Sequence, residues 1–502
     1  MKRRQFLQYF SATVIGPSVL SACSSDDSGN NSGNGMGNMN GMGETSHSAS
    51  LNYIKNQSLV IPPLYAGTDN NGVQEYNLTL KASSHILVEG ATTQTWSINP
   101  PDQTLAMLGP TLRLTNNRPV KIHYTNQLHE KTTMHGHGMH VPAAMDGGPH
   151  QIIDPNSSWT ADYTVKQKAS TNWYHPHAMG TTAEQVYKGL AGMIIVEDDE
   201  SATNGLPNTY GVDDLPIVLQ DRIMDGNAQF SYTPTRREQM WGFRGDIWLC
   251  NGQIEPDFNA KAGLLRLRLL NGSNAGIYKL SLSDGSNFFL VGTDGALLQS
   301  PVELSQIRLS PGERAEIVLN LTNKGGQSLS LQAQEEVTEK SQTFLNIHVL
   351  NEVADKTAVP TALTTLNLPS ASNAVRTRSF TLDMAGMGQF SINGKSMDLN
   401  TINETVSLNQ LEIWEITNQM RMPHNFHMHG IHFIPIERNG SAANLEAWER
   451  NCYKDTIFLA ANDRVKVLVK MEDYTDRNNP YMYHCHILEH EDAGMMGQFI
   501  VT

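Results

Sequence analysis

The sequence HGHGMH at residues 135–140 decides the fold of this chain, because it recurs as HMHGIH at residues 427–432. Both copies have the form H-x-H-G-x-H. A second motif follows each copy, WYHPH at residues 173–177 and MYHCH at residues 482–486. Paired motifs in the same order indicate an internal duplication. We therefore predict that the first and last parts of the chain are copies of one domain.

Other segments of the chain alternate in the manner of β-strands. LLRLRLL at residues 264–270 and RVKVLVK at residues 464–470 place leucine or valine at every second position. Helical periodicity is scarce, and Gly, Pro and Asn separate many short segments. This pattern predicts an all-β protein built from Greek-key β-sandwich domains, each of roughly 100 to 170 residues.

The chain is long enough for several domains. Its 502 residues exceed what one hydrophobic core usually organises. Prolines and asparagines near residues 204–208 indicate one linker, and the segment 353–373 indicates another. The predicted domains are domain 1 at residues 51–203, domain 2 at 204–353 and domain 3 at 354–502.

The first 22 residues have the features of an export signal. Arg3 and Arg4 precede a short apolar run, and LSAC at residues 20–23 closes the segment. The run falls short of the ~20 apolar residues that a membrane-spanning helix needs. Residues 1–22 resemble a twin-arginine signal peptide that ends in a lipoprotein cleavage box. We expect export to the periplasmic side of a bacterial membrane and a lipid anchor on Cys23.

Residues 23–50 are rich in Ser, Gly and Asn and contain Met36, Met39 and Met42. Such a segment is too polar to bury a core, so we expect a flexible tether. Methionine thioethers suit Cu(I), and a copper-collecting role for this segment is the alternative.

Charge and cysteine content exclude some classes of protein. Acidic residues outnumber basic residues by 50 to 36, which provides no electrostatic footprint for a nucleic-acid partner. Once Cys23 carries a lipid, three cysteines remain, an odd number that cannot form a full disulfide framework. Of these three, Cys250 and Cys452 have no nearby ligand set and are expected to be buried thiols.

The four H-x-H pairs are the strongest chemical signal in the sequence. Residues i and i+2 of a strand project from the same face, so each pair can hold metal jointly. One pair alone is as often a packing coincidence or half of a zinc site. Eight imidazoles are too many for one tetrahedral zinc and suit three copper ions that leave open positions for oxygen. The eight candidate ligands are His135, His137, His175, His177, His427, His429, His484 and His486.

The positions of the pairs predict where this copper cluster lies. Two pairs are in domain 1 and two in domain 3, so the cluster is expected at the interface between these domains. The only histidine between His177 and His424 is His348, so domain 2 is expected to bind no copper.

A second copper site is predicted around Cys485. His490 follows this cysteine by five residues and Met495 by ten, and His424 lies upstream. Two imidazoles and a thiolate hold copper in a trigonal arrangement, and a distant thioether tunes its potential. Taken singly, Cys485 would be an inert buried thiol and Met495 a core methionine. Together they predict a blue-copper site.

The two sites share one strand. Period-2 geometry directs the Cys485 side chain to one face of the strand and those of His484 and His486 to the other. An electron at the blue copper can therefore reach the cluster through covalent bonds.

From about residue 51 to residue 502 the chain resembles three-domain multicopper oxidases of the laccase superfamily, especially the bacterial periplasmic cuprous oxidases. The motifs that carry the resemblance are HGHG at 135–138, MDGGP at 145–149, WYHPH at 173–177, HNFHMHG at 424–430 and HCHILEHEDAGM at 484–495. The resemblance implies three cupredoxin-like domains, with a trinuclear copper cluster between the first and third.

The family pattern implies a role for each ligand among four copper ions. It assigns the type 2 ion to His135 and His427. It assigns type 1 copper to His424, Cys485, His490 and Met495. The six histidines that it assigns to the type 3 pair are His137, His175, His177, His429, His484 and His486.

The family pattern also implies a proton supply, because the reduction of dioxygen to two waters consumes four protons. Asp146 and Glu491 match the proton-relay carboxylates of the family. The alternatives are a turn residue for Asp146 and a surface charge for Glu491.

The chain departs from the family pattern around the type 1 site. Cuprous oxidases usually carry a methionine-rich insertion there, and the corresponding stretch contains only Met384, Met387 and Met397. Met420 stands where an aspartate that binds substrate copper is expected. Met422 matches a methionine that binds substrate copper, and its alternative is a core or rim methionine.

Other departures leave the ligand set complete. Gly136 stands where Trp or Leu is common, and Asn425 replaces a frequent Pro beside a type 1 ligand; both are expected to affect the surroundings of the copper and hence its potential. His140, His432 and His150 have no ligand role in the family and are expected beside the ligands or in solvent.

The predicted function is oxidation of a small reductant at type 1 copper, coupled to reduction of O₂ to water. Cu(I) and phenolic or aromatic compounds are the competing reductants, and copper detoxification is the expected physiology. Laccase-like or bilirubin-oxidase-like activity is the first alternative. A non-enzymatic copper-binding or structural relative is the second, although all twelve ligand positions are filled. We expect a monomer.

Overall fold

The computed structural model describes residues 51–386 and 388–502. The predicted signal peptide, the predicted tether with Met36, Met39 and Met42, the anchor residue Cys23, and Met387 lie outside the described residues. Among the described residues, no helix is both long and apolar enough to cross a membrane.

The described chain is an all-β protein, which confirms the predicted fold class. Its strands form six sheets of five to seven strands. Each sheet combines antiparallel neighbours with at least one parallel pair, such as β3 with β6 and β25 with β32. The described helices are short: α1 (Thr182–Lys188), α2 (Arg236–Trp241), α3 (Leu488–Asp492), and the 3₁₀ turns η1 (Ala143–Met145), η2 (Ala371–Asn373), η3 (Ala442–Asn444) and η4 (Ala447–Glu449).

Residues 64–197 form the first two sheets. One sheet has the order β1 (Leu64–Tyr65), β5 (Thr111–Thr115), β10 (Gly192–Glu197), β9 (Ser170–His175) and β7 (His135–His137). The other has the order β2 (Thr68–Asn70), β3 (Val73–Val88), β6 (Pro119–Asn126) and β8 (Ser158–Thr164), and β4 (Ala91–Asn99) pairs with β3.

Residues 214–353 form the next two sheets. The larger has the order β13 (Gln253–Ile254), β12 (Ile247–Cys250), β11 (Asp214–Arg222), β15 (Leu264–Asn271), β20 (Arg314–Asn320), β17 (Phe288–Thr293) and β18 (Leu297–Leu304). The smaller has the order β14 (Asp257–Ala262), β22 (Ser341–Val353), β21 (Ser328–Glu335), β16 (Tyr278–Leu282) and β19 (Gln306–Leu309).

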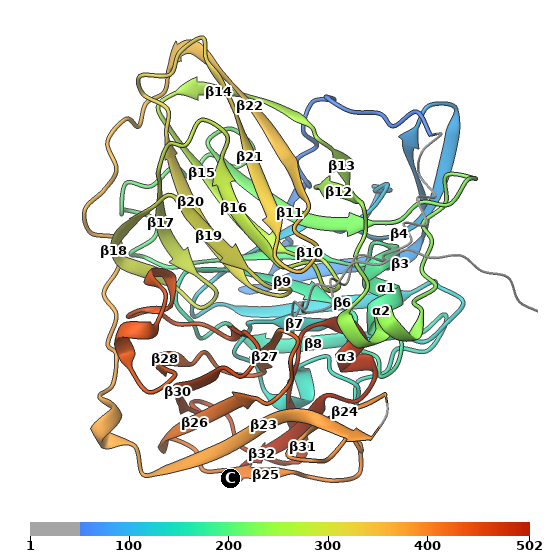
Figure 1. Cartoon of the computed structure of the whole chain (residues 1–502), viewed down its shortest axis with the longest axis vertical. Helices are drawn as coiled ribbons and strands as arrows, with labels where there is room; N and C mark the ends of the chain where they lie inside the picture. The colour runs from blue at the N-terminus through green and yellow to red at the C-terminus, as the bar shows by residue number, and fades with distance from the viewer. Residues whose placement is uncertain (1–50, 387) are drawn as a thin grey trace, which may run out of the picture. The chain divides into compact units, whose positions relative to one another are not determined.

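Residues 376–501 form the last two sheets, drawn in orange and red below the yellow and green strands of the middle segment (Figure 1). One has the order β24 (Gln389–Ile392), β23 (Arg376–Gly386), β26 (Leu411–Asn418), β30 (Arg464–Lys470) and β28 (Ile434–Arg438). The other has the order β25 (Glu404–Val406), β32 (Met496–Val501), β31 (Asp476–His484), β27 (His424–Met428) and β29 (Thr456–Leu459).

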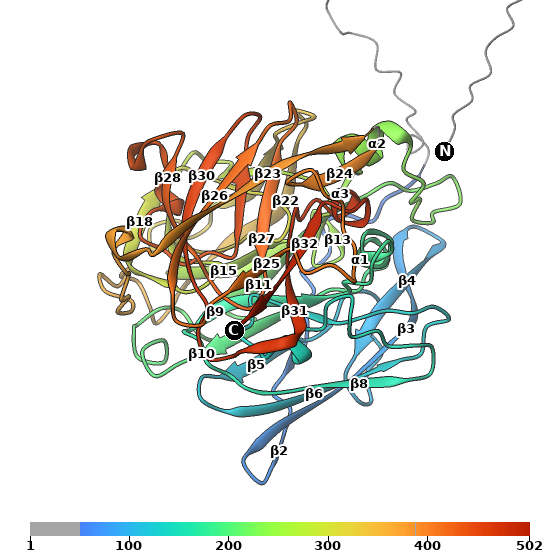
Figure 2. The same cartoon turned by 90° about the horizontal axis from the view of Figure 1, so that it is seen from below.

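Each pair of sheets encloses its own apolar core, and Figure 2 shows the first and last pairs at opposite edges of the view. The core of the last pair includes Cys485 and Met495. The domain boundaries at 203/204 and 353/354 stay predictions, because the described residues belong to one compact unit.

The duplicated motifs have the same strand register in both copies. In the first copy His135 on β7 lies opposite His175 on the neighbouring β9. In the last copy His427 on β27 lies opposite His484 on β31. The equivalent pairing arises because the spacing within each motif and the strand order around it are the same. It places two H-x-H pairs side by side in each copy.

The strand β15 differs from a simple half-buried strand. Its alternation of Leu with Arg266 and Arg268 is typical of one apolar and one solvent face, yet all eight residues of β15 are buried. Arg268 pairs with Asp214 at 2.8 Å, and Arg266 pairs with Glu316. These carboxylates supply the opposite charges that make burial of the two guanidinium groups possible.

Candidate metal centre

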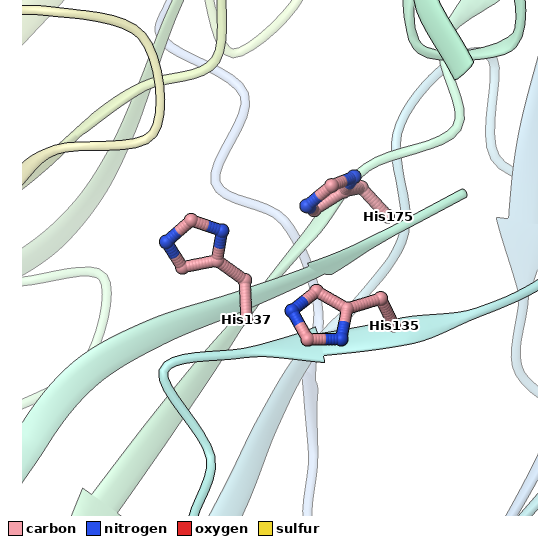
Figure 3. Close-up of side chains that lie close together, drawn as sticks. All are labelled: His135, His137 and His175. Carbon is pink, nitrogen blue, oxygen red and sulfur yellow. The ribbon is translucent and has the colours of Figure 1, made fainter. Parts of the chain in front are cut away.

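The structure gathers all eight histidines of the H-x-H pairs into one buried cluster. They come from β7 and β9 in the first copy, from β27 and β31 in the last copy, and from the residues that directly follow β9, β27 and β31. None is more than 1% exposed. Figure 3 shows part of the cluster: His135 and His137 project from the same side of their strand, and His175 lies across from them.

Stacked imidazole rings join the two copies across the cluster. The His135 and His429 ring centroids lie 3.9 Å apart with an interplanar angle of 16°. The corresponding values for His137 and His427 are 3.7 Å and 10°. A ligand pair from the first copy therefore faces the equivalent pair from the last copy.

Most of these rings have one nitrogen held by the protein. Nδ1 of His135 donates to the backbone oxygen of Asp146 at 2.7 Å, and Nδ1 of His175 donates to that of Pro176 at 2.7 Å. Nδ1 of His427 donates to the backbone oxygen of Asp455 at 2.8 Å. Such bonds fix the tautomer and the orientation of a metal-binding histidine.

The second nitrogen of these rings faces the cluster without a partner. A buried polar atom without a hydrogen bond is costly unless something else binds it. Unsatisfied nitrogens on one set of converging rings therefore fit bound metal ions. Within the described residues these atoms are Nε2 of His135, Nδ1 of His137, Nε2 of His175, Nε2 of His427 and both ring nitrogens of His486, together with Nδ1 of His177, which lies 3.4 Å from Oε1 of Glu491.

One group of three rings, His177, His429 and His484, has nitrogens close enough together to hold one ion, and a second group of three rings lies in the same cluster. Nε2 of His484 lies 3.1 Å from Nε2 of both His177 and His429. In the second group, the centroid of the His486 ring lies 4.9 Å from the centroid of the His137 ring and 5.3 Å from that of the His175 ring. Each group combines rings from both copies of the motif.

Burial makes these rings neutral donors. Burial is the main reason why the pKa of His177 is lowered to about 4. Neutral imidazole is the form that binds metal. Burial also lowers the pKa of His135, His137, His175, His429, His484 and His486 well below the ordinary value.

A second group of donors surrounds Cys485. Nδ1 of His424 lies 3.4 Å from the Cys485 sulfur, Nδ1 of His490 lies 3.7 Å from it, and the two nitrogens lie 3.1 Å apart. A point at about 2 Å from all three donors exists within this triangle, which is an ordinary metal–ligand distance. Met495 is fully buried in the same apolar cluster as Cys485. Burial raises the pKa of the Cys485 thiol to about 12, so metal has to displace its proton.

The two metal groups are joined through Cys485. Its sulfur belongs to the triangular site, while the rings of His484 and His486 belong to the eight-histidine cluster. Nδ1 of His484 also donates to the Cys485 backbone oxygen at 3.0 Å. A continuous path of covalent bonds and one hydrogen bond therefore connects the sites.

Asp146 lies beside the cluster. It is 1% exposed, and its Oδ2 accepts a hydrogen bond of 2.7 Å from Nδ1 of His429. The following turn requires glycine, because Gly147 has φ +73° and a Cβ there would lie 1.8 Å from the backbone oxygen of Met134. The tight turn brings Asp146 under the strand that carries His135.

Glu491 also lies beside the cluster, on α3. It is fully buried, with Oε1 3.4 Å from Nδ1 of His177 and Oε2 3.3 Å from Nδ1 of His484. Burial, the largest cause, raises the pKa of this carboxyl well above the ordinary value. Asp146 and Glu491 thus both contact cluster histidines, and neither is a surface residue.

Asp455 is a functional candidate that sequence reasoning missed. Its Oδ1 accepts a hydrogen bond of 3.0 Å from Nε2 of His137, and its backbone oxygen holds His427. Arg314 on β20 contacts both Asp455 oxygens, at 2.7 and 2.5 Å. The tripeptide KDT at residues 454–456 matches no motif, so nothing in the sequence pointed to this contact.

The helix α2 covers the Cys485 site. Nε2 of His490 donates to the Met240 backbone oxygen at 3.0 Å, and the Phe390 ring lies 4.1 Å from the His490 ring. A cavity of about 990 Å³ lies on the outer side of these groups. Its lining includes Tyr232, Met240, Met384, Phe390, Glu489 and Asp492.

The methionines found near this site fall into two groups. Met422 and Met420 are 8% and 7% exposed and belong to the apolar core. Met384 and Met240 are partly buried, pack on the same core and line the cavity. No sequence motif indicated Met240, because it comes from a distant middle segment.

The remaining predicted residues occupy peripheral positions. Nε2 of His140 lies 3.0 Å from Nδ1 of His432, and His150 contacts the Gln498 side chain at 2.8 Å. Cys250 and Cys452 are free, buried thiols, as expected.

Comparisons with known proteins agree with this arrangement. Two family models, both described as multicopper oxidase, match residues 81–201 and 362–502. The chain is 36% identical over 441 residues to the multicopper oxidase mco of Staphylococcus aureus, which covers 86% of this chain and 90% of that protein. It is 34% identical over 464 residues to the cell division protein FtsP of Photorhabdus laumondii, which covers 89% and 93%.

A solved structure extends the likeness to three dimensions. The laccase-like multicopper oxidase CueO from Ochrobactrum sp. is 33% identical, with a TM-score of 0.79. The match covers 88% of this chain and 100% of that chain.

Proposed function

Because the chain belongs to the multicopper oxidase family, we propose that it couples one-electron oxidation of a small reductant to the four-electron reduction of O₂ to water. The observation that carries this proposal is the set of buried, unpartnered imidazole nitrogens that converge from both copies of the motif. When bound, copper supplies one-electron redox chemistry at the Cys485 site and a place for O₂ at the cluster.

The proposed assignment has four copper ions. His424, Cys485, His490 and Met495 would hold type 1 copper. His135 and His427 would hold type 2 copper, and their free Nε2 atoms support this role. The type 3 pair would be held by two triplets: His137, His175 and His486, and His177, His429 and His484.

The residues of this chain would perform three tasks in turnover. Cys485 carries electrons from the first site to His484 and His486 through its sulfur, its backbone and the bond from its carbonyl to His484. Asp146 and Glu491 hold protons beside the cluster for transfer toward reduced oxygen. The buried walls exclude bulk water from the cluster.

The reductant would dock in the cavity beneath α2. All four type 1 ligands are 0% exposed, so a reductant reaches none of them directly. Met240 is half-buried and lines the cavity, and its backbone oxygen contacts His490. Electron entry through the Met240 peptide requires no covalent bond between enzyme and substrate.

Cu(I) is the proposed physiological reductant, in a copper-detoxifying role. The Met240 and Met384 thioethers at the cavity are soft donors that suit Cu(I). The balanced reaction is 4 Cu(I) + O₂ + 4 H⁺ → 4 Cu(II) + 2 H₂O. Phenol oxidation is the alternative, because the aromatic lining and the volume of the cavity would also admit an aromatic ring.

The proposed location is the periplasmic side of a bacterial membrane. The support is the sequence of residues 1–23, which resembles a twin-arginine signal that ends in a lipoprotein cysteine. We propose lipid attachment at Cys23 and a monomeric enzyme.

Oxygen consumption by the copper-loaded protein tests the function. We expect four copper ions per chain, a blue absorption band, and faster O₂ uptake with Cu(I) than with a phenol. Uptake with the phenol alone would support the laccase alternative. Full copper content with no uptake from either reductant would overturn the enzyme proposal, and would favour a non-enzymatic role of the kind that the likeness to FtsP raises.

Silver binding tests the cavity independently of turnover, because Ag(I) is a soft monovalent ion that does not donate an electron here. We expect the Met240→Leu/Met384→Leu double variant to lose at least about tenfold in Ag(I) affinity. Met107→Leu is the matched control, since Met107 lines a separate cavity. Equal Ag(I) affinity in all three proteins would remove the two thioethers from substrate binding.

A further inference from the structure

His140 and His432 are equivalent residues of the duplicated motif, because each is the last histidine of its H-x-H-G-x-H copy. Neither belongs to the eight-histidine cluster. The structure nevertheless brings them together, with Nε2 of His140 3.0 Å from Nδ1 of His432. Their ring centroids lie 4.5 Å apart at an interplanar angle of 44°. The duplication therefore creates one more pair of facing imidazoles, outside both metal groups described above.

The geometry of this pair resembles that of the two histidines at the Cys485 site. There Nδ1 of His424 and Nδ1 of His490 lie 3.1 Å apart, and the centroids lie 4.7 Å apart at an angle of 49°. For metal–nitrogen bonds of about 2 Å, the 3.0 Å separation of the His140 and His432 nitrogens corresponds to an N–metal–N angle of roughly 97°. Such an angle suits two neighbouring positions of a tetragonal ion, the geometry that Cu(II) adopts with nitrogen and oxygen ligands.

A hydrogen bond between two neutral rings has the same length, but the surroundings of this pair favour an ion. Both rings line a cavity of about 380 Å³, and His140 is only half-buried, so an ion can reach the pair. Positive charge in the cavity lining is balanced by ion pairs and opposes a cation only weakly. These ion pairs are Lys166 with Asp473 at 3.1 Å, Lys168 with Glu200 at 2.8 Å and Lys470 with Glu472 at 2.7 Å.

The protein holds the two histidines in place from both sides. A Cβ at Gly295 would lie 2.6 Å from Cγ of His432, so the middle segment packs against this ring as closely as only glycine allows. In the first copy, the Gln167 side chain accepts a hydrogen bond of 2.9 Å from the His140 backbone N–H and donates to the Gly138 oxygen at 3.0 Å. These contacts fix the His432 ring and the backbone that carries His140. Burial lowers the pKa of both rings, which favours the neutral form that binds metal.

Asp455 supplies a carboxylate behind the pair. With Nδ1 of His432 on an ion, Nε2 of the same ring carries the proton. This buried atom lacks a hydrogen-bond partner in the described part of the chain and lies 3.8 Å from Oδ2 of Asp455. A carboxylate near the second nitrogen is typical of histidines that bind metal. Because Asp455 also accepts a hydrogen bond from His137, one carboxylate lies between this pair and the eight-histidine cluster.

We propose that His140 and His432 form a further metal site, which binds one Cu(II) ion through Nε2 of His140 and Nδ1 of His432 and completes its coordination with water from the cavity. Among divalent first-row ions, Cu(II) binds nitrogen donors most tightly. The ion is exchangeable, because only two protein ligands hold it and the cavity is accessible. The site shares no ligand with the eight-histidine cluster or the Cys485 site, so its occupation does not depend on the proposed function.

Two variants remove one ligand each. His140→Gln changes a half-buried side chain at the cavity and should leave the fold intact, whereas His432→Gln changes a buried one. His348→Gln is the matched control, because His348 is also half-buried but contacts Ser328 and Asp257 and no second imidazole. Thermal melting of each variant checks that it is folded, and His140→Gln is sufficient for the test if His432→Gln does not fold.

The measurement is equilibrium dialysis of the copper-loaded protein against Cu(II), followed by metal analysis. We expect the parent and His348→Gln to bind one more Cu(II) than either ligand variant at the same free concentration. The affinity of the ligand variants for this ion should be at least about tenfold weaker, since even the loss of an orienting group costs that much. Electron paramagnetic resonance of the additional ion should show a tetragonal signal with coupling to two nitrogens.

The outcomes distinguish this site from the proposed function. Equal Cu(II) binding by the parent and His140→Gln would overturn the site, and so would a parent that binds no additional ion. A parent without a blue band or without O₂ uptake would instead overturn the proposed function. The difference in bound Cu(II) between parent and variant would still report the His140–His432 pair alone.

Discussion

Oδ1 of Asp455 accepts a hydrogen bond of 3.0 Å from Nε2 of His137, across 318 residues of sequence. The backbone oxygen of the same residue holds His427. One residue therefore orients both rings of the stacked His137–His427 pair. Arg314, from the middle segment, fixes the Asp455 carboxylate from the other side.

Asp455→Asn should weaken copper binding and destabilise the protein. The change leaves Arg314 as a buried charge without its main partner, which costs about 3–5 kcal/mol, and loss of an orienting group lowers metal affinity about 10- to 100-fold. Copper content after dialysis against a chelator, together with thermal melting, measures both effects. Asp473→Asn is the control, because its pairing with Lys166 is partly exposed. A variant that matched the parent in both measurements would exclude this role.

Asp146→Asn should slow turnover while the copper content stays near normal. The amide oxygen can still accept the hydrogen bond from His429, so the ligand keeps its orientation. The amide cannot hold and release a proton, and general acid–base groups contribute roughly 10²- to 10⁴-fold to rate. Steady-state O₂ uptake and metal analysis of the same sample provide the test. Unchanged turnover would remove Asp146 from the mechanism.

Glu491→Gln should lower the maximal rate more than it changes the KM for the reductant. Glu491 contacts His177 and His484 inside the protein, and it does not itself line the cavity that would bind the reductant. The rate of electron entry into type 1 copper, followed by bleaching of the blue band without O₂, should therefore stay unchanged. If the blue band of the variant bleached more slowly without O₂, Glu491 would act on electron entry into type 1 copper and not on proton transfer.

Removal of copper should make the protein sensitive to acid. The folded-state pKa of His177 is about 4, below the ordinary value of 6.5. The unfolded chain then binds more protons, so the contribution of His177 to stability is complete above pH 6.5 and is lost as pH falls toward 4. This loss is on the order of 3 kcal/mol for this residue. Circular dichroism as a function of pH should show that copper-free protein unfolds at a higher pH than copper-loaded protein. Equal midpoint pH values in the two forms would contradict the assignment of His177 as a copper ligand.

The sequence predicted those parts of the site that depend on local geometry. The H-x-H pairs could be placed on strands because a period of two puts both rings on one face, and His135 and His137 lie on β7 in this way. The triangular site followed from the short spacing of Cys485, His490 and Met495. Both predictions rested on short spacings along the chain, apart from His424, which lies 61 residues before Cys485.

The parts that sequence reasoning missed depend on contacts between distant segments. Asp455 acquires its role from Arg314, which lies 141 residues away. Met240 reaches His490 across 250 residues. Arg266 and Arg268 alternate like solvent-facing residues, and only their pairing with Glu316 and Asp214 reveals that they are buried. No local pattern contains the identity of such partners.

The equal strand register of the two copies shows which residue distinguishes the first copy from the last. His175-Pro176-His177 and His484-Cys485-His486 occupy equivalent positions, so the central residue is the difference between them. Pro176 has neither a sulfur atom nor a backbone N–H. The first copy therefore has no metal-binding side chain at the position that Cys485 occupies in the last copy. The two copies therefore contribute nearly equivalent histidines, but under the proposed function only the last copy would deliver electrons to the cluster, through the Cys485 sulfur.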